Sequence, residues 1–90
     1  MTEDEINSFR QKLSQSMSFP GVYMFKFIIT SDHRNLALVD NLFGSEAEIS
    51  TKESSEGKYT SITARQVVMD VDEIINVYLK ATKIEGIMFL

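Results

Sequence analysis

His33 is the single histidine of this 90-residue chain, and it directly follows Asp32. A histidine beside a carboxylate is the pattern of a general base with the group that orients it. The same position also suits a solvated histidine at the start of a predicted helix. The chain has no second histidine and no cysteine, which excludes thiol nucleophiles, thiolate metal sites and disulfides. We therefore interpret His33 as a solvated residue without a catalytic role.

Two groups of acidic residues, Glu3 to Glu5 and Asp70 to Glu73, could be imagined to hold a divalent cation. Each group falls in the first turn of a predicted helix, where the helix dipole stabilises negative charge. Both also have the spacing of a capping box, so we interpret them as helix caps. The four glycines lack the spacing of a phosphate-binding loop, and no serine lies in a nucleophile elbow. The sequence therefore predicts no enzyme, no metal and no cofactor.

The composition, 43% hydrophobic and 24% charged residues, is typical of a soluble globular protein of one domain. A net charge of −4 disfavours nonspecific binding to nucleic acid or to anionic lipid. No apolar run approaches the ~20 residues of a bilayer span, and the acidic segment 2–6 is unlike a signal peptide. We expect a cytoplasmic protein that does not bind membranes.

Hydrophobic periodicity divides the chain into alternating elements. Apolar residues recur at intervals of three and four from Ile6 to Met17, which predicts an amphipathic helix. Further helices are predicted to begin at Ser31 or Asp32 and at Asp70. The predicted strands are 22–30, 46–53, 58–69 and 84–90. A break in alternation at Val67 and Val68 predicts a bulge or a strand exit.

The order of elements after the leading helix is β-α-β-β-α-β, which is the ferredoxin-like pattern. We therefore predict an α+β two-layer sandwich with an antiparallel sheet of strand order 4-1-3-2 and both helices on one face. The polar strand 46–53 falls at a sheet edge in this order, as its composition requires. Residues 1–18 would form the extra N-terminal helix and its linker, and residues 19–90 the ferredoxin-like domain.

The two faces of the central strands differ in composition. Phe25, Phe27 and Ile29 are predicted to face the helices, with Ile62, Ala64 and Val68 beside them. The opposite face is the candidate interaction face: Met24, Lys26, Ile28, Tyr59, Ser61, Thr63 and Arg65. Apolar area on a solvated sheet face usually marks a contact.

Three occupants of this face are open from the sequence. The leading helix could cover its own sheet or that of a neighbour, and we favour a homodimer, or else another protein as partner. A small-molecule ligand is a further alternative. RNA-recognition motifs share this topology but display aromatic side chains on the central strands, whereas Tyr59 is the one aromatic residue here. RNA binding is therefore the weaker hypothesis.

Four segments carry a family resemblance: FPGVYMFKF at 19–27, GKYTSIT at 57–63, EIINVY at 73–78 and IEGIMFL at 84–90. Together they resemble the small bacterial YbeD-like proteins, a domain-of-unknown-function family. The resemblance implies a ferredoxin-like fold similar to ACT regulatory domains, in a cytoplasmic, non-catalytic protein linked with regulation and lipoate metabolism. The family has no established catalytic residues to transfer. This chain departs from the family pattern in a short first helix and an added N-terminal segment.

We predict that His33→Ala changes the free energy of unfolding by less than about 0.5 kcal/mol, as is usual for a surface substitution. Urea titration of both proteins measures the difference. A larger loss of stability would show that His33 makes a contact which the sequence does not reveal.

Overall fold

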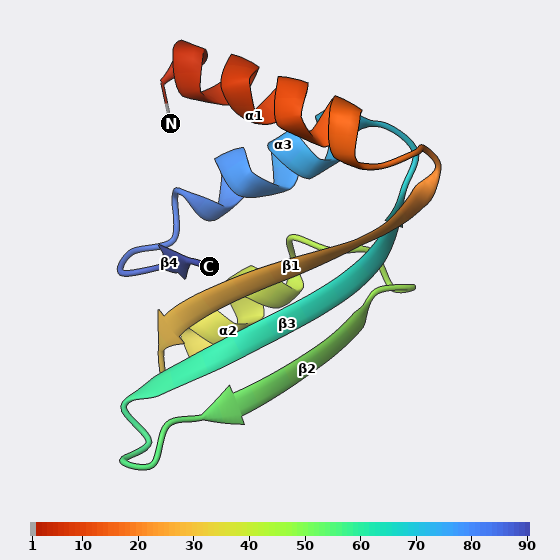
Figure 1. The fold of residues 1–90 in the computed structure, drawn as a ribbon. Helices are drawn as coiled ribbons and strands as arrows, with labels where there is room; N and C mark the ends of the chain where they lie inside the picture. The colour runs from red at the N-terminus through yellow and green to blue at the C-terminus, as the bar shows by residue number, and fades with distance from the viewer. Residues whose placement is uncertain (1) are drawn as a thin grey trace.

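The computed structural model describes residues 2–90 and contains three helices and four strands (Figure 1). In chain order these are α1 (Glu3–Ser16), β1 (Gly21–Thr30), α2 (His33–Asp40), β2 (Glu48–Glu53), β3 (Tyr59–Val68), α3 (Val71–Ala81) and β4 (Met88–Phe89). The strands form one antiparallel sheet in the order β2-β3-β1-β4. This order is the predicted 4-1-3-2 read from the other edge, so the predicted ferredoxin-like α+β fold is confirmed.

The acidic residues at the helix starts act as caps. The Thr2 hydroxyl accepts the backbone N–H of Glu5, and the Glu5 carboxylate accepts that of Thr2, both at 3.2 Å. The hydrogen bond from the Thr2 N–H, followed in size by the effect of the Thr2 side chain, favours the charged carboxylate and lowers the pKa of Glu5. At α3, the Asp70 carboxylate accepts the N–H of Glu73 at 3.0 Å, and the Glu73 carboxylate accepts that of Met69 at 2.7 Å. The capping interpretation is therefore confirmed at both helices.

An aromatic cluster fills the space between the sheet and the helices. The alternation of β1 turns Phe25, Phe27 and Ile29 toward this space, where they are at most 1% exposed. The rings of Phe25 and Phe27 meet Phe43 and Tyr78 with centroid distances of 5.2 to 6.3 Å. The buried residues of β3 are the predicted Ile62, Ala64 and Val68. The predicted assignment of the strand faces is confirmed.

Helix α1 packs on α3 and not on the sheet face that carries Met24, Lys26 and Ile28, which we term the open face (Figure 1). Leu13 of α1 is buried in the common core, and the Phe9 ring meets Tyr78 edge-on at 5.3 Å between centroids. The alternative in which α1 covers its own open face is therefore wrong. The buried residues of α3 extend over a wide arc of the helix surface, and the sheet covers only part of this arc. Helix α1 packs on α3 because it covers the rest of the arc.

The turn between α1 and β1 brings two backbone segments close together. The Phe19–Pro20 peptide bond is cis, and Gly21 follows it. A Cβ atom at Gly21 would lie 2.7 Å from the carbonyl oxygen of Ser18, closer than real Cβ atoms approach a backbone oxygen. A side chain is therefore sterically excluded at this position.

Of the two features predicted at Val67 and Val68, the strand exit is present, because β3 ends at Val68, and the bulge does not form. The register of β1 and β3 runs without interruption from Gly21 opposite Val68 to Thr30 opposite Tyr59. The break in hydrophobic alternation has another cause, because Val67 lies on the open face and is 60% exposed. An exposed apolar residue next to a buried one breaks the apolar–polar alternation of the sequence in the same way as a bulge would.

Two predicted elements are shorter in the structure. The apolar stripe from Leu36 to Phe43 predicts a helix that continues to Gly44, whereas α2 ends at Asp40. The N–H groups of Leu42 and Phe43 bond to carbonyls three residues back, which ends the α-helical pattern. The predicted strand 84–90 is a strand only at Met88–Phe89. Ile84 instead continues the core side of α3 and is 5% exposed, since the chain makes tight turns there before it reaches the sheet.

We predict that Phe27→Ala lowers the free energy of unfolding by about 3–5 kcal/mol, because it leaves a cavity in the fully buried cluster. Phe89→Ala is the matched control and should lose less, because Phe89 is 42% exposed. Thermal and urea unfolding measure both variants. A Phe27→Ala protein that melts within a degree or two of wild type would contradict the assigned strand faces.

The hydroxyl groups of Tyr23 and Tyr78 lie 3.2 Å apart within the aromatic cluster. The pKa of Tyr78 is raised well above its usual value, mainly because the phenol is buried and to a smaller extent because it forms a hydrogen bond with Tyr23. The folded state therefore retains the Tyr78 proton at pH values where the unfolded chain releases it.

This difference predicts a loss of stability in alkali. Above the unfolded pKa of about 10, the unfolded chain binds fewer protons, so the free energy of unfolding falls by up to ~1.4 kcal/mol per pH unit for this group. Urea titrations between pH 8 and 11 should show a shallower fall for Tyr78→Phe than for wild type. Tyr59→Phe, at an exposed tyrosine, is the control and should retain the wild-type slope. Equal slopes for all three proteins would contradict the prediction.

Candidate interaction surface

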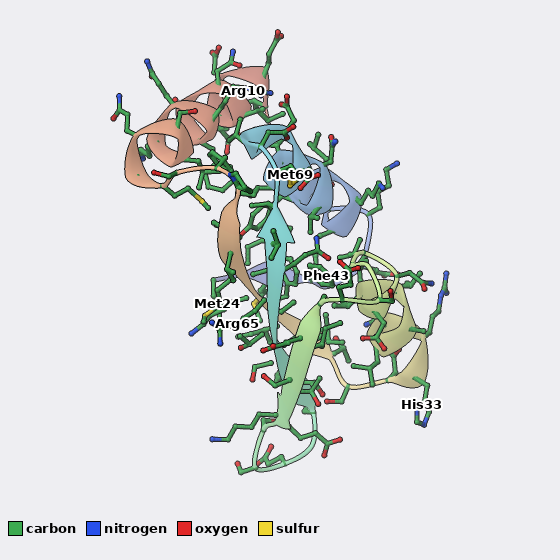
Figure 2. All side chains as sticks on the ribbon, turned by 90° about the vertical axis from the view of Figure 1, so that its right-hand side faces the viewer. Arg10, Met24, His33, Phe43, Arg65 and Met69 are labelled. Carbon is green, nitrogen blue, oxygen red and sulfur yellow. The ribbon has the colours of Figure 1, made fainter. Side chains whose placement is uncertain are left out.

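All seven predicted interaction residues lie on the open face. Their positions follow from alternation along β1 and β3 and from the register of the two strands. The register pairs Met24 with Arg65, Lys26 with Thr63, and Ile28 with Ser61, while Tyr59 pairs with Thr30. Figure 2 shows Met24 and Arg65 projecting to the same side of the sheet, away from α2. These seven residues therefore share one surface of the sheet.

Further apolar side chains extend the open face beyond the predicted set. Val22 pairs with Val67 across β1 and β3, and Met88 of β4 pairs with Ile28. Val22, Val67 and Met88 are each about half exposed or more, and so is Leu90, two positions after Met88. Uninterrupted alternation along β3 would have revealed Val67. Met88 could not be assigned from sequence, because its place depends on the register of a two-residue strand.

The open face carries charged side chains of both signs. Lys26 and Arg65 lie on the central strands, and β2 contributes Lys52 opposite Ser61. The carboxylate of Glu48 belongs to the residue paired in register with Arg65, and Glu46 and Glu53 line the two ends of the same face. Within residues 2–90 the single side-chain ion pair joins α1 to α3, so none of these three cations has a carboxylate within 4 Å. Three basic and three acidic side chains therefore lie on or at the border of this face.

Two shallow hollows lie near opposite ends of the open face. The larger, about 210 Å³, is lined by Ile28, Lys52, Glu53, Ser54, Tyr59 and Ser61. The smaller, about 120 Å³, is lined by Val22, Glu46, Glu48, Arg65, Gln66 and Val67. Val22 and Ile28 are ~20 Å apart along an extended strand. Both hollows are smaller than the ~300 Å³ at which small-molecule pockets begin, and their separation suits an elongated partner.

Tyr59 lies apart from the basic residues at the centre of the open face. Six positions of β3 separate Tyr59 from Arg65, which is ~20 Å along the strand. The Lys58 ammonium group lies over the Tyr59 ring at 5.5 Å from its centroid. The aromatic residues of β1 belong to the core on the other face. Lys26, Arg65 and Tyr59 therefore do not form one compact basic and aromatic patch.

His33 lies away from the open face, at the outer end of α2, where its side chain is exposed (Figure 2). The carboxylate of Asp32 accepts the N–H of Asn35 at 2.6 Å, so Asp32 is the N-cap of α2. A hollow of about 430 Å³ borders both residues, together with Glu53 and Thr60. The geometry gives Asp32 a role in capping, and it leaves His33 exposed as the sequence predicted.

The part of the chain that the structure describes holds no group of three His, Asp or Glu side chains close enough to bind a metal ion. Across the same residues, 2–90, every helix is too short or too polar to span a bilayer.

The fold and its exposed sheet face define a small ferredoxin-like α+β domain with an apolar sheet face that no helix of residues 2–90 covers. The chain belongs to the family described as "Protein of unknown function (DUF493)", which matches residues 14–90. The YbeD-like resemblance of the sequence is thereby confirmed.

The curated relatives are likewise named as UPF0250 proteins. A UPF0250 protein of Shewanella piezotolerans is 32% identical over 80 residues, and a UPF0250 protein of Shewanella baltica is 35% identical over 81 residues. Each alignment covers 84% of this chain and 91% of the relative. No solved structure matches the chain.

Proposed function

We propose that this chain is a small non-catalytic protein-interaction domain with a regulatory role, which acts through the open face. The observation that carries the proposal is a group of exposed apolar side chains, Val22, Met24 and Val67, on a sheet face that no helix of residues 2–90 covers. Contiguous apolar surface of this kind usually marks a contact site. The occupant is a second copy of the chain or another protein.

Binding to protein is favoured over binding to RNA by the nature of this surface. Single-stranded RNA is recognised by bases stacked on aromatic rings, and the rings of β1 are used in the core. The apolar side chains of the open face resemble a protein contact instead. The net charge of −4 adds a general repulsion for phosphate.

A non-catalytic role is favoured by the positions of Asp32 and His33, the adjacent pair whose residue types suit a general base and its orienting carboxylate. The Asp32 carboxylate is engaged in the α2 cap, and the side chain of His33 lies in solvent. Neither arrangement orients a proton toward a reacting group. The partner would be met in the cytoplasm, where the sequence analysis places the chain.

Site-specific photocrosslinking tests the proposal. A photoreactive amino acid at Met24 should give a discrete adduct in the expressing cells, because Met24 is 48% exposed at the centre of the open face. The matched control is Leu38, which is 37% exposed on α2 on the other side of the sheet. The Met24 adduct should disappear when Ile28→Glu adds a negative charge to the same face, while the Leu38 position should give no discrete adduct.

Equal adducts from both positions, or none from either, would contradict the proposal. The mass of the adduct and light scattering identify the occupant. A wild-type chain that is monomeric at ~100 µM excludes a homodimer of micromolar affinity, and the partner is then another protein. An adduct of twice the chain mass identifies a second copy.

A further inference from the structure

A further hollow, of about 360 Å³, lies where β1 ends, α2 begins and the chain turns between α3 and β4 (Figure 1). Its volume is above the ~300 Å³ at which small-molecule pockets begin, unlike that of the two hollows at the open face. No residue of the candidate interaction face lines it. The lining residues are Thr30, Asp32, Arg34, Asn35, Leu38, Lys83 and Glu85.

Asn35 brings a nearly buried polar side chain to this hollow, because it is only 9% exposed. Its side-chain Nδ2 donates to the carbonyl of Thr30 at 3.4 Å, whereas its Oδ1 accepts no hydrogen bond from residues 2–90. Among the buried and half-buried residues of this range, no fully enclosed side-chain nitrogen or oxygen lacks a partner. The Oδ1 atom is therefore the accessible part of Asn35 and opens into the hollow. An acceptor in this position favours a ligand that brings a hydrogen-bond donor.

The neighbouring hollow beside His33 has no such acceptor. Its buried polar residue is Thr60, which is 7% exposed, and the Thr60 hydroxyl forms a hydrogen bond with that of Ser31 at 2.6 Å. The unpaired oxygen therefore distinguishes the hollow beside Asn35.

Charges of both signs surround the Asn35 side chain. Arg34 and Lys83 bring two cations to the lining, and Asp32 and Glu85 bring two carboxylates. The single side-chain ion pair within residues 2–90 joins α1 to α3, so these cations and carboxylates lie more than 4 Å from one another. The lining is neutral as a whole and its charges are not paired with each other. A ligand with one charge of each sign is complementary to it.

The arrangement of these charges favours a ligand that spans the hollow. The start of α2 supplies Asp32 and Arg34, and the turns after α3 supply Lys83 and Glu85, so each wall brings one charge of each sign. A ligand with its charges at two ends can pair with one wall at each end. Leu38, which is 37% exposed, offers apolar contact for a methylene chain between the two ends.

We propose that this hollow binds a small zwitterion with an ammonium group and a carboxylate at the two ends of a short methylene chain. The ammonium group donates to Oδ1 of Asn35 and is flanked by the carboxylate of Glu85. The ligand carboxylate pairs with Arg34 and Lys83, and the methylene groups lie on Leu38. This binding site goes beyond the proposed function and does not depend on it, because it lies on another surface.

Titration of the isotope-labelled chain, followed by NMR, tests this inference. The probe is 4-aminobutyrate, and the readout is the side-chain amide of Asn35 and the backbone amides of residues 82–86. These signals should shift saturably with a dissociation constant on the order of 1 mM, because so small a ligand makes few contacts. Butyrate lacks the ammonium group, butylamine lacks the carboxylate and glycine lacks the methylene chain, so each should bind roughly tenfold more weakly.

Matched variants separate the hollow from a general effect of charge. Arg34→Gln with Lys83→Gln removes both cations of the hollow at exposed positions and should weaken 4-aminobutyrate binding roughly tenfold. Lys12→Gln with Lys52→Gln makes the same change in net charge at exposed positions elsewhere and should retain the wild-type affinity. Asn35→Ala, with its fold verified by circular dichroism, should also weaken binding, read from the signals of residues 82–86.

The inference is overturned if 4-aminobutyrate at ~20 mM, well above the expected dissociation constant, leaves these signals in place. It is also overturned if butyrate or butylamine binds as tightly, because the hollow would then recognise one charge only. Tighter binding of glycine would reject the separated charges. An unchanged affinity in the Arg34→Gln and Lys83→Gln variant would place the ligand elsewhere. The Met24 crosslink involves the open face, so its result and this one are independent.

Discussion

The two-residue period of β1 is the constraint on which the rest of the structure depends. This strand lies between β3 and β4, and successive side chains must point to opposite faces. Once Phe25 and Phe27 enter the core, Met24, Lys26 and Ile28 are necessarily on the other face. The strand is apolar on both faces because one face forms the core and the other remains uncovered. The candidate surface is therefore a geometric consequence of the core.

Tyr78 connects the elements that this core brings together. Its ring meets Phe9 of α1, Phe25 and Phe27 of β1, and Phe89 of β4, with centroid distances between 5.3 and 5.8 Å. Edge and tilted contacts of this kind stabilise beyond the burial of area alone. The hydroxyl oxygen of Tyr78 has that of Tyr23 as its hydrogen-bond partner, so this polar atom is not left unpaired in the cluster. One side chain of α3 thus ties α1 and β4 to the central strand.

Sequence patterns predicted the features that depend on neighbouring residues. Alternation assigned the faces of β1 and most of β3, and the polar composition of 46–53 placed that strand at the edge. Features that depend on distant partners were missed. The length of β4 depends on how many residues the turns after α3 use. The packing position of α1 depends on the width of the apolar surface of α3. Val67 was misread because the pattern assumes that an apolar residue is buried.

The brevity of β4 has a consequence for the backbone of β1. On the β4 side, only Phe27 and Ile28 have strand partners within residues 2–90. The carbonyl of Lys26 accepts the N–H of Leu90, so backbone groups of the same parity, at Val22 and Met24, are directed to that side as well. The first half of β1 therefore behaves as an edge strand, although β1 lies inside the strand order. The backbone amide protons of this segment should exchange with solvent in an alternating pattern, fast at residues without a strand partner on the β4 side and slow at residues bonded to β3. A strand from another protein chain would pair first with this segment.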